Sequence, residues 1–585
     1  MMYLPVEQLH SRAESLVAKF KQGGGRGYIE KAIDLDREAL QLLPPGHPKR
    51  SVSLTRLAYA LRDRYNQFGA TRDLEEAIVL DREALDLRPP GHSDRSISLS
   101  YLAVGLSARY EQLGRSGDLD AAIVLHREAL NLRPLGHPDR SISLNNLAVV
   151  LSIRYQQLGG VVDLDEAIDL HKEALNLRPH GHPGRSVSLN NLAAGLSTRY
   201  TRLGGMEDLD VAIVLHREAL DLRPRGHPDR SMSLNNLAAV LSTRYQQLGG
   251  MEDLDEAVVL HREALNLRPQ GHPGRSMPLN NLAMVLSTRY QQVGGMEDLD
   301  EAIILHREAL SLRLQGHPDR SMSLNNLAVV LSVRYKQLRG TEDLNEAIIL
   351  HREALDLRPQ GHPDRSHSLN NLATVLSTRY NQLREMEDLD NAIVLHREAL
   401  NLCSQAHPDR SASLNNLAIV LSTRYRQLRG MEDLYDAIVL HREALGLRPQ
   451  GHPERSKPLT RLTAGLPTRY QQLGETVDLD EAIVLGREAL DLRPLGHPDG
   501  MKSLNNFAVG LSTRDDQLGR IEDVDKAIVL GRETLDLCPQ GHPDQSPPLI
   551  NLAVHLSTRY EHLRGMEDLG AAIVFGRETR DLCSQ

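Results

Sequence analysis

One feature of this chain, a repeat of 45 residues, limits what it can fold into more than any other. A histidine recurs at this interval without insertion or deletion, in the series His47, His92, His137, His182, His227, His272, His317, His362, His407, His452, His497 and His542. Thirteen such periods account for all 585 residues. A period of this length is typical of repeat proteins, in which stacked units bury a core that no unit could bury alone.

The first half of each unit predicts an amphipathic helix, here called the A helix. In the unit that spans residues 138–181, apolar side chains recur at intervals of three and four, at Leu144, Leu147, Ala148, Leu151, Tyr155 and Leu158. This spacing is typical of a helix of about 18 residues. Pro278, Pro458 and Pro548 occupy the position of Ser143 in other units. Because proline is tolerated only in the first turn, the A helix should begin near Arg140 or Ser141.

The second half of the unit predicts another helix, here called the B helix. Gly159 and Gly160 should end the A helix, and the acidic run from Asp163 to Glu166 suits the start of the next one. Apolar residues follow at Leu164, Ala167, Ile168, Leu170, Ala174, Leu175 and Leu177. Pro179 and Gly181 mark the end of the B helix. The short connection makes the two helices antiparallel neighbours.

These residues resemble the tetratricopeptide repeat, and most closely its kinesin-light-chain subtype. The resemblance lies in His137-Pro138-Asp139 followed by Leu144-Asn145-Asn146-Leu147-Ala148, and then in Ala167-Ile168, Glu173-Ala174-Leu175 and Pro179. The unit has 45 residues instead of the usual 34, because the segment 152–160 lengthens the A helix. The units are also similar to the repeat portion of fungal proteins that continue into a caspase-like CHAT protease domain.

The resemblance implies an all-α fold, a right-handed superhelical solenoid of antiparallel helix pairs with the A helices on the concave side. We expect residues 1–47 to form an N-terminal capping repeat, residues 48–542 eleven tandem helix pairs, and residues 543–585 a C-terminal repeat. Pro467 lies in the middle of the eleventh A helix. A kink is therefore expected at 465–467.

A pair of asparagines on the A helix is the candidate binding feature. The pair recurs as Asn145 and Asn146, Asn190 and Asn191, Asn235 and Asn236, Asn280 and Asn281, Asn325 and Asn326, Asn370 and Asn371, Asn415 and Asn416, and Asn505 and Asn506. Asparagine can both donate to and accept from a peptide backbone, so a concave row of these residues would bind an extended partner. The alternative is a ladder of asparagines that bond neighbouring helices.

Other recurring polar residues favour structural roles. Arg154 is expected to pair with acidic residues of the B helix, and Tyr155 belongs to the apolar stripe. Two histidines in a typical unit, such as His137 and His171, lie in different elements. Equivalent loop histidines are separated by a helix pair, or at least ~10 Å, so no metal site is expected. No nucleophile motif or phosphate-binding loop is present, which predicts that the chain is not an enzyme and needs no cofactor.

Charge and composition narrow the class of partner. The 68 basic and 78 acidic residues leave a net charge of −10 that is spread along the chain, so we expect no nucleic acid partner. The three cysteines are scattered, and no stretch is long and apolar enough for a signal peptide or a membrane span. These features predict a cytoplasmic protein without membrane association.

The sequence therefore predicts a protein-interaction scaffold that binds proteins or extended peptides along a concave groove. An alternative is the recognition or regulatory arm of a larger effector, such as a CHAT-type protease or a signalling ATPase. The identity of the partner and the oligomeric state stay open at this point.

Overall fold

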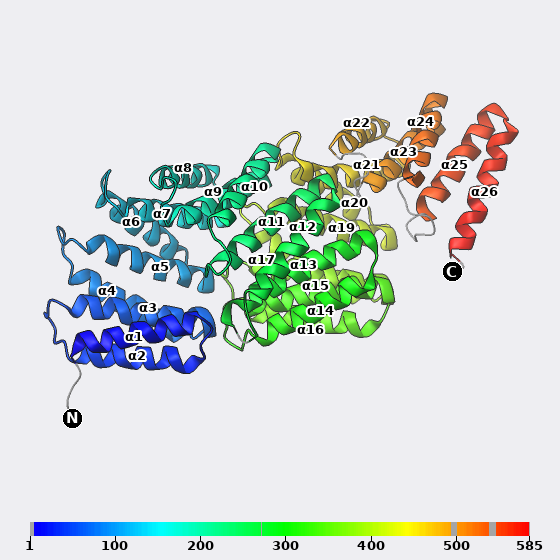
Figure 1. Cartoon of the computed structure of the whole chain (residues 1–585). Coiled ribbons are helices and arrows are strands. Elements are labelled where there is room, and N and C mark those ends of the chain that lie inside the picture. Colours follow the sequence, from blue (N-terminus) through cyan, green and yellow to red (C-terminus); the bar gives the residue numbers. More distant parts are fainter. Residues whose placement is uncertain (1–4, 271, 493–499, 537–545, 584–585) are drawn as a thin grey trace.

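The computed structural model describes residues 5–270, 272–492, 500–536 and 546–583. Within these ranges the chain forms 26 α-helices, two short 3₁₀ turns and no strand. The helices follow one another as antiparallel pairs along an elongated superhelix, with the two termini at opposite ends (Figure 1). The predicted all-α fold of stacked helix pairs is thereby confirmed.

The A helices carry odd numbers and the B helices even numbers. The A helices are α1 (Val6–Lys21), α3 (Arg50–Phe68), α5 (Arg95–Leu113), α7 (Arg140–Leu158), α9 (Arg185–Leu203), α11 (Arg230–Leu248), α13 (Ser276–Val293), α15 (Arg320–Leu338), α17 (Arg365–Leu383), α19 (Arg410–Leu428), α21 (Ser456–Leu473), α23 (Gly500–Leu518) and α25 (Ser546–Leu563). The B helices are α2 (Arg26–Gln41), α4 (Thr71–Asp86), α6 (Ser116–Asn131), α8 (Val161–Asn176), α10 (Met206–Asp221), α12 (Met251–Asn266), α14 (Met296–Ser311), α16 (Thr341–Asp356), α18 (Met386–Leu402), α20 (Met431–Gly446), α22 (Val477–Asp491), α24 (Ile521–Asp536) and α26 (Met566–Cys583). The 3₁₀ turns Pro273–Arg275 and Pro453–Arg455 precede α13 and α21.

The ends of the A helix follow from its local sequence. Helix α7 begins at Arg140, as predicted. Just before it, Nδ1 of His137 accepts a hydrogen bond from the backbone N–H of Asp139 at 3.1 Å, so the loop histidine holds the turn that starts the helix. Gly159 ends α7 with a left-handed φ of 74°. Helix α21 continues through Pro467, so the proline does not end that helix.

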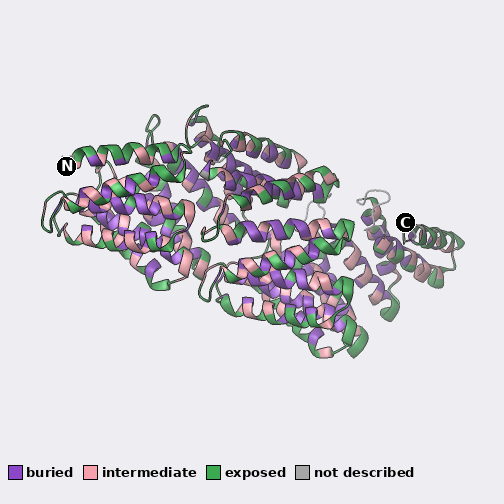
Figure 2. Cartoon of the chain, turned by 90° about the horizontal axis from the view of Figure 1, so that it is seen from below, coloured by how far each residue is buried: buried purple, intermediate pink, exposed green. Residues whose placement is uncertain are grey.

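The core lies between the two helix layers and runs continuously from one unit to the next. Leu151 and Tyr155 of α7 are at most 2% exposed, and Leu164 and Ile168 of α8 are fully buried. Buried residues form bands along the inner faces of the helix pairs, and exposed residues cover the outside (Figure 2). Each fully buried leucine or isoleucine contributes about 1.5–3 kcal/mol relative to exposure. Burial of these stripes therefore holds the stack together.

An ion pair closes each helix hairpin from α3–α4 to α25–α26. In the hairpin of α7 and α8, the guanidinium of Arg154 binds the carboxylate of Asp163 through two hydrogen bonds, of 2.7 and 2.6 Å. Asp163 lies in the first turn of α8, where a negative charge also suits the helix dipole. The pairing confirms the expectation for Arg154. The same pair recurs in later units, for example Arg424 with Asp433.

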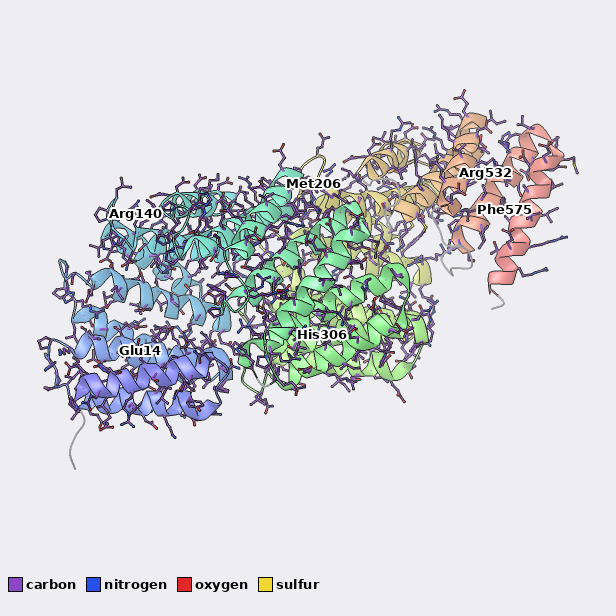
Figure 3. All side chains as sticks on the ribbon, viewed as in Figure 1. Glu14, Arg140, Met206, His306, Arg532 and Phe575 are labelled. Atoms are coloured by element: carbon purple, nitrogen blue, oxygen red, sulfur yellow. The ribbon has the colours of Figure 1, made fainter. Side chains whose placement is uncertain are left out.

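Neighbouring units are joined by a buried polar network that starts on the B helix. His171 of α8 contacts Oδ1 of Asn145 on α7 through Nδ1, at 2.8 Å. Nδ2 of Asn145 then donates to Oγ of Ser188 on α9, in the next unit, at 3.0 Å. Figure 3 marks His306, the equivalent histidine of α14, which is fully buried. Each link thus fixes three helices from two units.

A buried arginine at the end of each typical B helix forms a second link. Arg178 is 6% exposed. It donates to Oγ of Ser141 on α7 and to Oγ of Ser188 on α9, both at 3.0 Å. It also donates to the carbonyl oxygen of Gly184 at 2.8 Å. Because hydroxyl and carbonyl oxygens from two units share one cation, the arginine sets the register between these units.

Stacking of many units brings successive turns of the superhelix into contact. Arg448 donates from Nη1 to the carbonyl oxygen of Thr201 at 3.1 Å, across 247 residues of sequence. His452 contacts the same oxygen through Nε2, also at 3.1 Å. Its Nδ1 accepts from the N–H of Glu454, so Nε2 carries the hydrogen. The array is therefore more than a row of nearest-neighbour contacts, because units far apart in sequence support each other.

A first prediction concerns a gap in the polar network. Pro278 occupies the position equivalent to Ser188, and Nδ2 of Asn235 is buried with no hydrogen-bond partner among the described residues. A buried donor without a partner costs about 1–3 kcal/mol. Pro278→Ser should therefore raise the free energy of unfolding by about 1 kcal/mol, after the gain in unfolded-state entropy is subtracted. Thermal denaturation and amide exchange of α11 measure the change.

The reverse substitution provides the matched control. Ser323 accepts from Nδ2 of Asn280 at 3.0 Å. Ser323→Pro should therefore destabilise the protein by a similar amount. The network would carry no stability if neither substitution changed the denaturation midpoint.

A second prediction concerns the pH dependence of stability. Burial lowers the pKa of the B-helix histidines to about 4 in His171, His216, His261, His306 and His396, and to about 3 in His351 and His441. The unfolded chain binds protons near the ordinary pKa of about 6.5. The free energy of unfolding should therefore be constant above that pH and fall as the pH drops from 6.5 towards 4. Each histidine contributes a loss of about 1.4 kcal/mol per pH unit in this window.

Denaturation midpoints measured between pH 8 and pH 4.5 test this expectation. A midpoint that stays level down to pH 5 would show that these histidines are protonated as easily in the fold as in water.

Candidate protein-binding groove

The A helices form the inner wall of the superhelix. A helices of adjacent units contact each other, as α7 does α9 and α13 does α15. Each presents one stripe that its partner B helix does not cover. On α7 this inner stripe contains Ile142, Asn146 and Val149, and the two apolar residues are 44% and 43% exposed. The inner wall therefore combines apolar surface with one amide in each typical unit.

The structure separates the two asparagines of each pair. The first is buried in Asn145, Asn190, Asn235, Asn280 and Asn325, and half-buried in Asn370, Asn415 and Asn505. In the first seven of these, Oδ1 contacts Nδ1 of the B-helix histidine at 2.7–2.9 Å. Oδ1 of Asn505 accepts from Asn551 at 2.9 Å. These residues belong to the links between helices.

The second asparagine of each pair lies on the inner stripe. This inner row consists of Asn146, Asn191, Asn236, Asn281, Asn326, Asn371, Asn416 and Asn506, all half-buried. Asn506 donates to the carbonyl oxygen of Thr460 at 3.2 Å. Nδ2 of Asn326 lies 3.9 Å from the sulfur of Met284. The amides of this row are placed where a bound segment could reach them.

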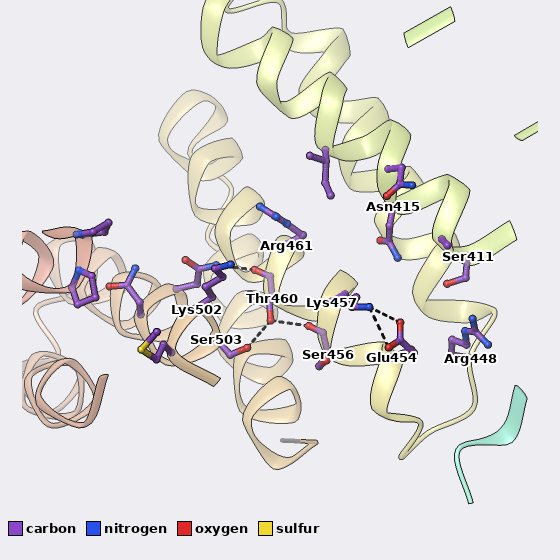
Figure 4. Close-up of a pocket in the computed structure, with 18 residues that line it drawn as sticks. Ser411, Asn415, Arg448, Glu454, Ser456, Lys457, Thr460, Arg461, Lys502 and Ser503 are labelled. Carbon is purple, nitrogen blue, oxygen red and sulfur yellow. Dashed lines mark hydrogen bonds and ion pairs between the residues drawn. The ribbon is translucent and has the colours of Figure 1, made fainter. Parts of the chain in front are cut away.

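Near the C-terminal end the inner stripes of four A helices enclose a groove of about 480 Å³. Its walls come from α19, α21, α23 and α25, with the loop before α21 at one end (Figure 4). Asn416 and Ile419 line the α19 side, and Asn505, Asn506 and Pro547 lie further along. Equivalent positions of successive units converge on one cavity, which shows that this face is concave.

Positive charge gathers in this groove. Lys457 and Arg461 project from α21 and Lys502 from α23, all three exposed. Arg448 lies at the loop end, and burial lowers the pKa of its guanidinium. Glu454 is the one carboxylate among the described lining residues, and it binds Nζ of Lys457 at 2.9 Å. The groove therefore has an excess of cations in a protein whose net charge is −10.

A short hydrogen-bond chain fixes the floor of the groove. Oγ1 of Thr460 donates to the carbonyl oxygen of Ser456 at 2.7 Å, and it lies 2.7 Å from Oγ of Ser503 on α23 (Figure 4). Thr460 thus bridges α21 and α23 as Asn145 bridges α7 and α9. This keeps α21 and α23 in register although the asparagine pair is replaced at this point.

The three exposed cations were not among the predicted site residues. The available signal was a departure from the repeat: Lys457 and Lys502 stand where α7 has Ile142, and Arg461 stands where it has Asn146. A search for recurring residues passes over such positions, because function in a near-identical array can lie in the units that differ.

Among the described residues no three histidine, cysteine or acidic side chains lie close enough to share a metal ion. In the same part of the chain, no helix has the length and hydropathy needed to cross a bilayer.

Comparison with known proteins gives a family match and several structural neighbours. The model of the tetratricopeptide repeat matches residues 142–184, 230–274, 279–319, 366–409 and 410–454. No curated protein matches the sequence. Among solved structures, the human IFIT1 dimer with m7Gppp-AAAA is 14% identical, with a TM-score of 0.43 and coverage of 90% of this chain and 96% of that one.

Two other solved structures belong to different organisms. Yeast Tom70 is 16% identical with a TM-score of 0.34, and the match covers 86% of this chain and 96% of that chain. A Podosopora anserina putative kinesin light chain with nearly identical TPR-like repeats is 20% identical with a TM-score of 0.29. That match covers 37% of this chain and 98% of that chain.

One expectation from the sequence is wrong. The even spread of charge predicts no nucleic acid partner, yet the IFIT1 dimers similar to this chain were solved with m7Gppp-AAAA and PPP-AAAA. The physical reason is that net charge averages over the whole surface. A chain with a negative net charge can still gather cations on its inner wall, as Lys457, Arg461 and Lys502 do here.

The family match recurs in five units, and the same helix pair repeats through the described residues. Five units of the chain therefore match the tetratricopeptide repeat.

Proposed function

We propose that this chain is a non-enzymatic scaffold that holds an extended protein segment along its inner wall. The observation that carries the proposal is the groove of about 480 Å³ formed by α19, α21, α23 and α25. Its length along four successive units suits an extended chain better than a compact ligand. A cytoplasmic location is part of the proposal, because Cys403 is a free, buried thiol and structural disulfides are rare in that compartment.

The groove favours a segment that carries carboxylates. Lys457, Arg461 and Lys502 offer charge-assisted hydrogen bonds, which are about twice as strong as neutral ones. Asn416 and Asn506 are placed to bond the backbone of the same segment. Ile419 and Pro547 supply apolar contact. The bound segment would thus alternate acidic and apolar side chains along an extended backbone.

A third prediction tests the charge of the groove. In the double variant Lys457→Ala with Lys502→Ala, a short fluorescein-labelled peptide of glutamate, leucine and serine should bind about tenfold more weakly, a loss of about 1.4 kcal/mol. Fluorescence anisotropy measures the affinity, and the difference should shrink at high salt. Both lysines are exposed, so the fold should not change.

Lys526→Ala is the matched control, since this lysine is exposed on α24 and does not line the groove. Equal peptide affinity in the double variant and in this control would contradict the proposal. An adenine oligonucleotide serves as a second probe: tighter binding of this RNA than of the peptide, lost in the double variant, would assign the groove to nucleic acid instead.

A fourth prediction separates the two rows of asparagines. Asn371→Ala with Asn416→Ala removes two amides of the inner row, so peptide affinity should fall while the melting temperature stays unchanged. Asn190→Ala with Asn280→Ala instead removes the partners of His216 and His306. Because a buried group without a partner costs about 1–3 kcal/mol, this variant should melt at a lower temperature. If both variants lost only stability, the inner row would have no binding role.

A further inference from the structure

The corner between the A and B helices is the point where one turn of the superhelix touches the next. Each corner follows an A helix with one residue in the left-handed conformation. A Cβ added to Gly69 would lie 1.6 Å from the carbonyl oxygen of Gly316, and one added to Gly114 would lie 1.5 Å from that of Gly361. Gly159 meets the carbonyl oxygen of Ala406 in the same way, at 1.6 Å. Docking of a loop on a corner therefore requires glycine.

Four corners later in the chain carry arginine at the same position. These arginine corners are Arg339, Arg384, Arg429 and Arg564, with φ values of 57–59°. An L-residue other than glycine pays roughly 1–2 kcal/mol in this conformation. All four side chains are exposed. Three of them stack over the last tyrosine of their own A helix, 5.7–5.8 Å from the ring centre. The equivalent corners of the first turn carry glycine. Gly474 and Gly519 occupy this position between the later arginine corners, and a Cβ added there would meet nothing within 4 Å among the described residues.

The same molecule also carries loops that could dock on a corner but do not. These free loops contain Gly46, Gly91, Gly136 and Gly226, which are exposed. A Cβ added to any of them would meet nothing within 4 Å among the described residues. The free loop Gly136-His137-Pro138-Asp139 has the same residues as the docked loop Gly316-His317-Pro318-Asp319. A second copy of the chain thus presents the structure that the glycine corners already bind.

We propose that the edge formed by the arginine corners fits the free loops of a second copy of this chain, and that the four arginines keep this contact from forming. The Cβ of each arginine would occupy the space of the incoming carbonyl oxygen, as it would at Gly69 and Gly114. A contact between the late corners of one molecule and the early loops of another is head-to-tail. Such a contact leaves a free edge and free loops on every assembly, so further copies can add until a ring closes or a filament grows.

The positive charge of arginine would by itself favour this contact. The free loops carry Asp139 and Asp229, which would attract a guanidinium on a facing corner. The proposal therefore depends on the backbone position and the Cβ, and charge and shape can be separated by substitution.

The test compares two quadruple variants. In one, Arg339, Arg384, Arg429 and Arg564 are all replaced by glycine; in the other, all four are replaced by alanine. Both lose the same charges and only the alanine variant keeps Cβ atoms. Sedimentation velocity over a range of concentrations gives the mass of the full chain, which is 65.2 kDa as a monomer. Circular dichroism checks that helix content is unchanged.

We expect the native chain and the alanine variant to stay at the monomer mass. The glycine variant should reach at least twofold that mass at the highest concentration, in a concentration-dependent manner. A glycine variant that stays monomeric would overturn the proposal. Equal association of the alanine variant would also overturn it, because charge and not the Cβ would then be the barrier. Association of the native chain in the same range would show that the arginines block nothing.

Discussion

The architecture depends on the hydrogen bonds that a buried arginine makes between neighbouring units. Among the described residues no carboxylate contacts Arg178, and its N–H groups donate to serine hydroxyls of two neighbouring A helices and to a loop carbonyl. A buried cation that lost any of these partners would be costly, so the two helices cannot slide past each other. The same link recurs at Arg133, Arg223 and Arg358, each of which donates to a serine on either side of its interface. Regular stacking of the A helices, and with it the inner wall, depends on such links.

The interface between α18 and α19 lacks the arginine. Cys403 stands where the arginine would be, and its sulfur lies 3.9 Å from Oγ of Ser413. The thiol is 3% exposed, and burial raises its pKa. It fills space but cannot join two helices through several hydrogen bonds. The cationic groove begins just after this interface, with α19 as its first wall. The groove thus begins beside an interface without the arginine, where Asn370 still donates to Oγ of Ser413 at 2.9 Å.

Much of the fold could be predicted from sequence, because period, apolar stripes and cap residues are local signals. The start of α7 at Arg140 followed from where Pro278 is tolerated, and the hairpin ion pair followed from Arg154 and Asp163. The sequence did not predict that Asn145 would be buried while Asn146 lies on the inner stripe. Adjacent helix residues point about 100° apart, and only the crossing of the next unit decides which one is covered.

The contacts between turns could not be predicted from the sequence, for a different reason. A small rotation at each interface must be summed over many units before Thr201 meets Arg448, and no local pattern encodes that sum. The sequence reflects these contacts indirectly, through the choice of glycine or arginine at the corners. The cations of the groove are visible in the sequence as residues that differ from those at the equivalent positions of other units.

The contact between turns also determines how the chain responds to mechanical load. An open superhelix lengthens like a soft spring, because every interface bends a little. Here the hydrogen bonds from Arg448 and His452 to Thr201 bridge two turns. A pull on the two ends must part these bonds first, and the segment between Thr201 and Arg448, which are 247 positions apart, is shielded from tension until then. The scaffold therefore keeps its length under small forces and extends in a step once the turns separate.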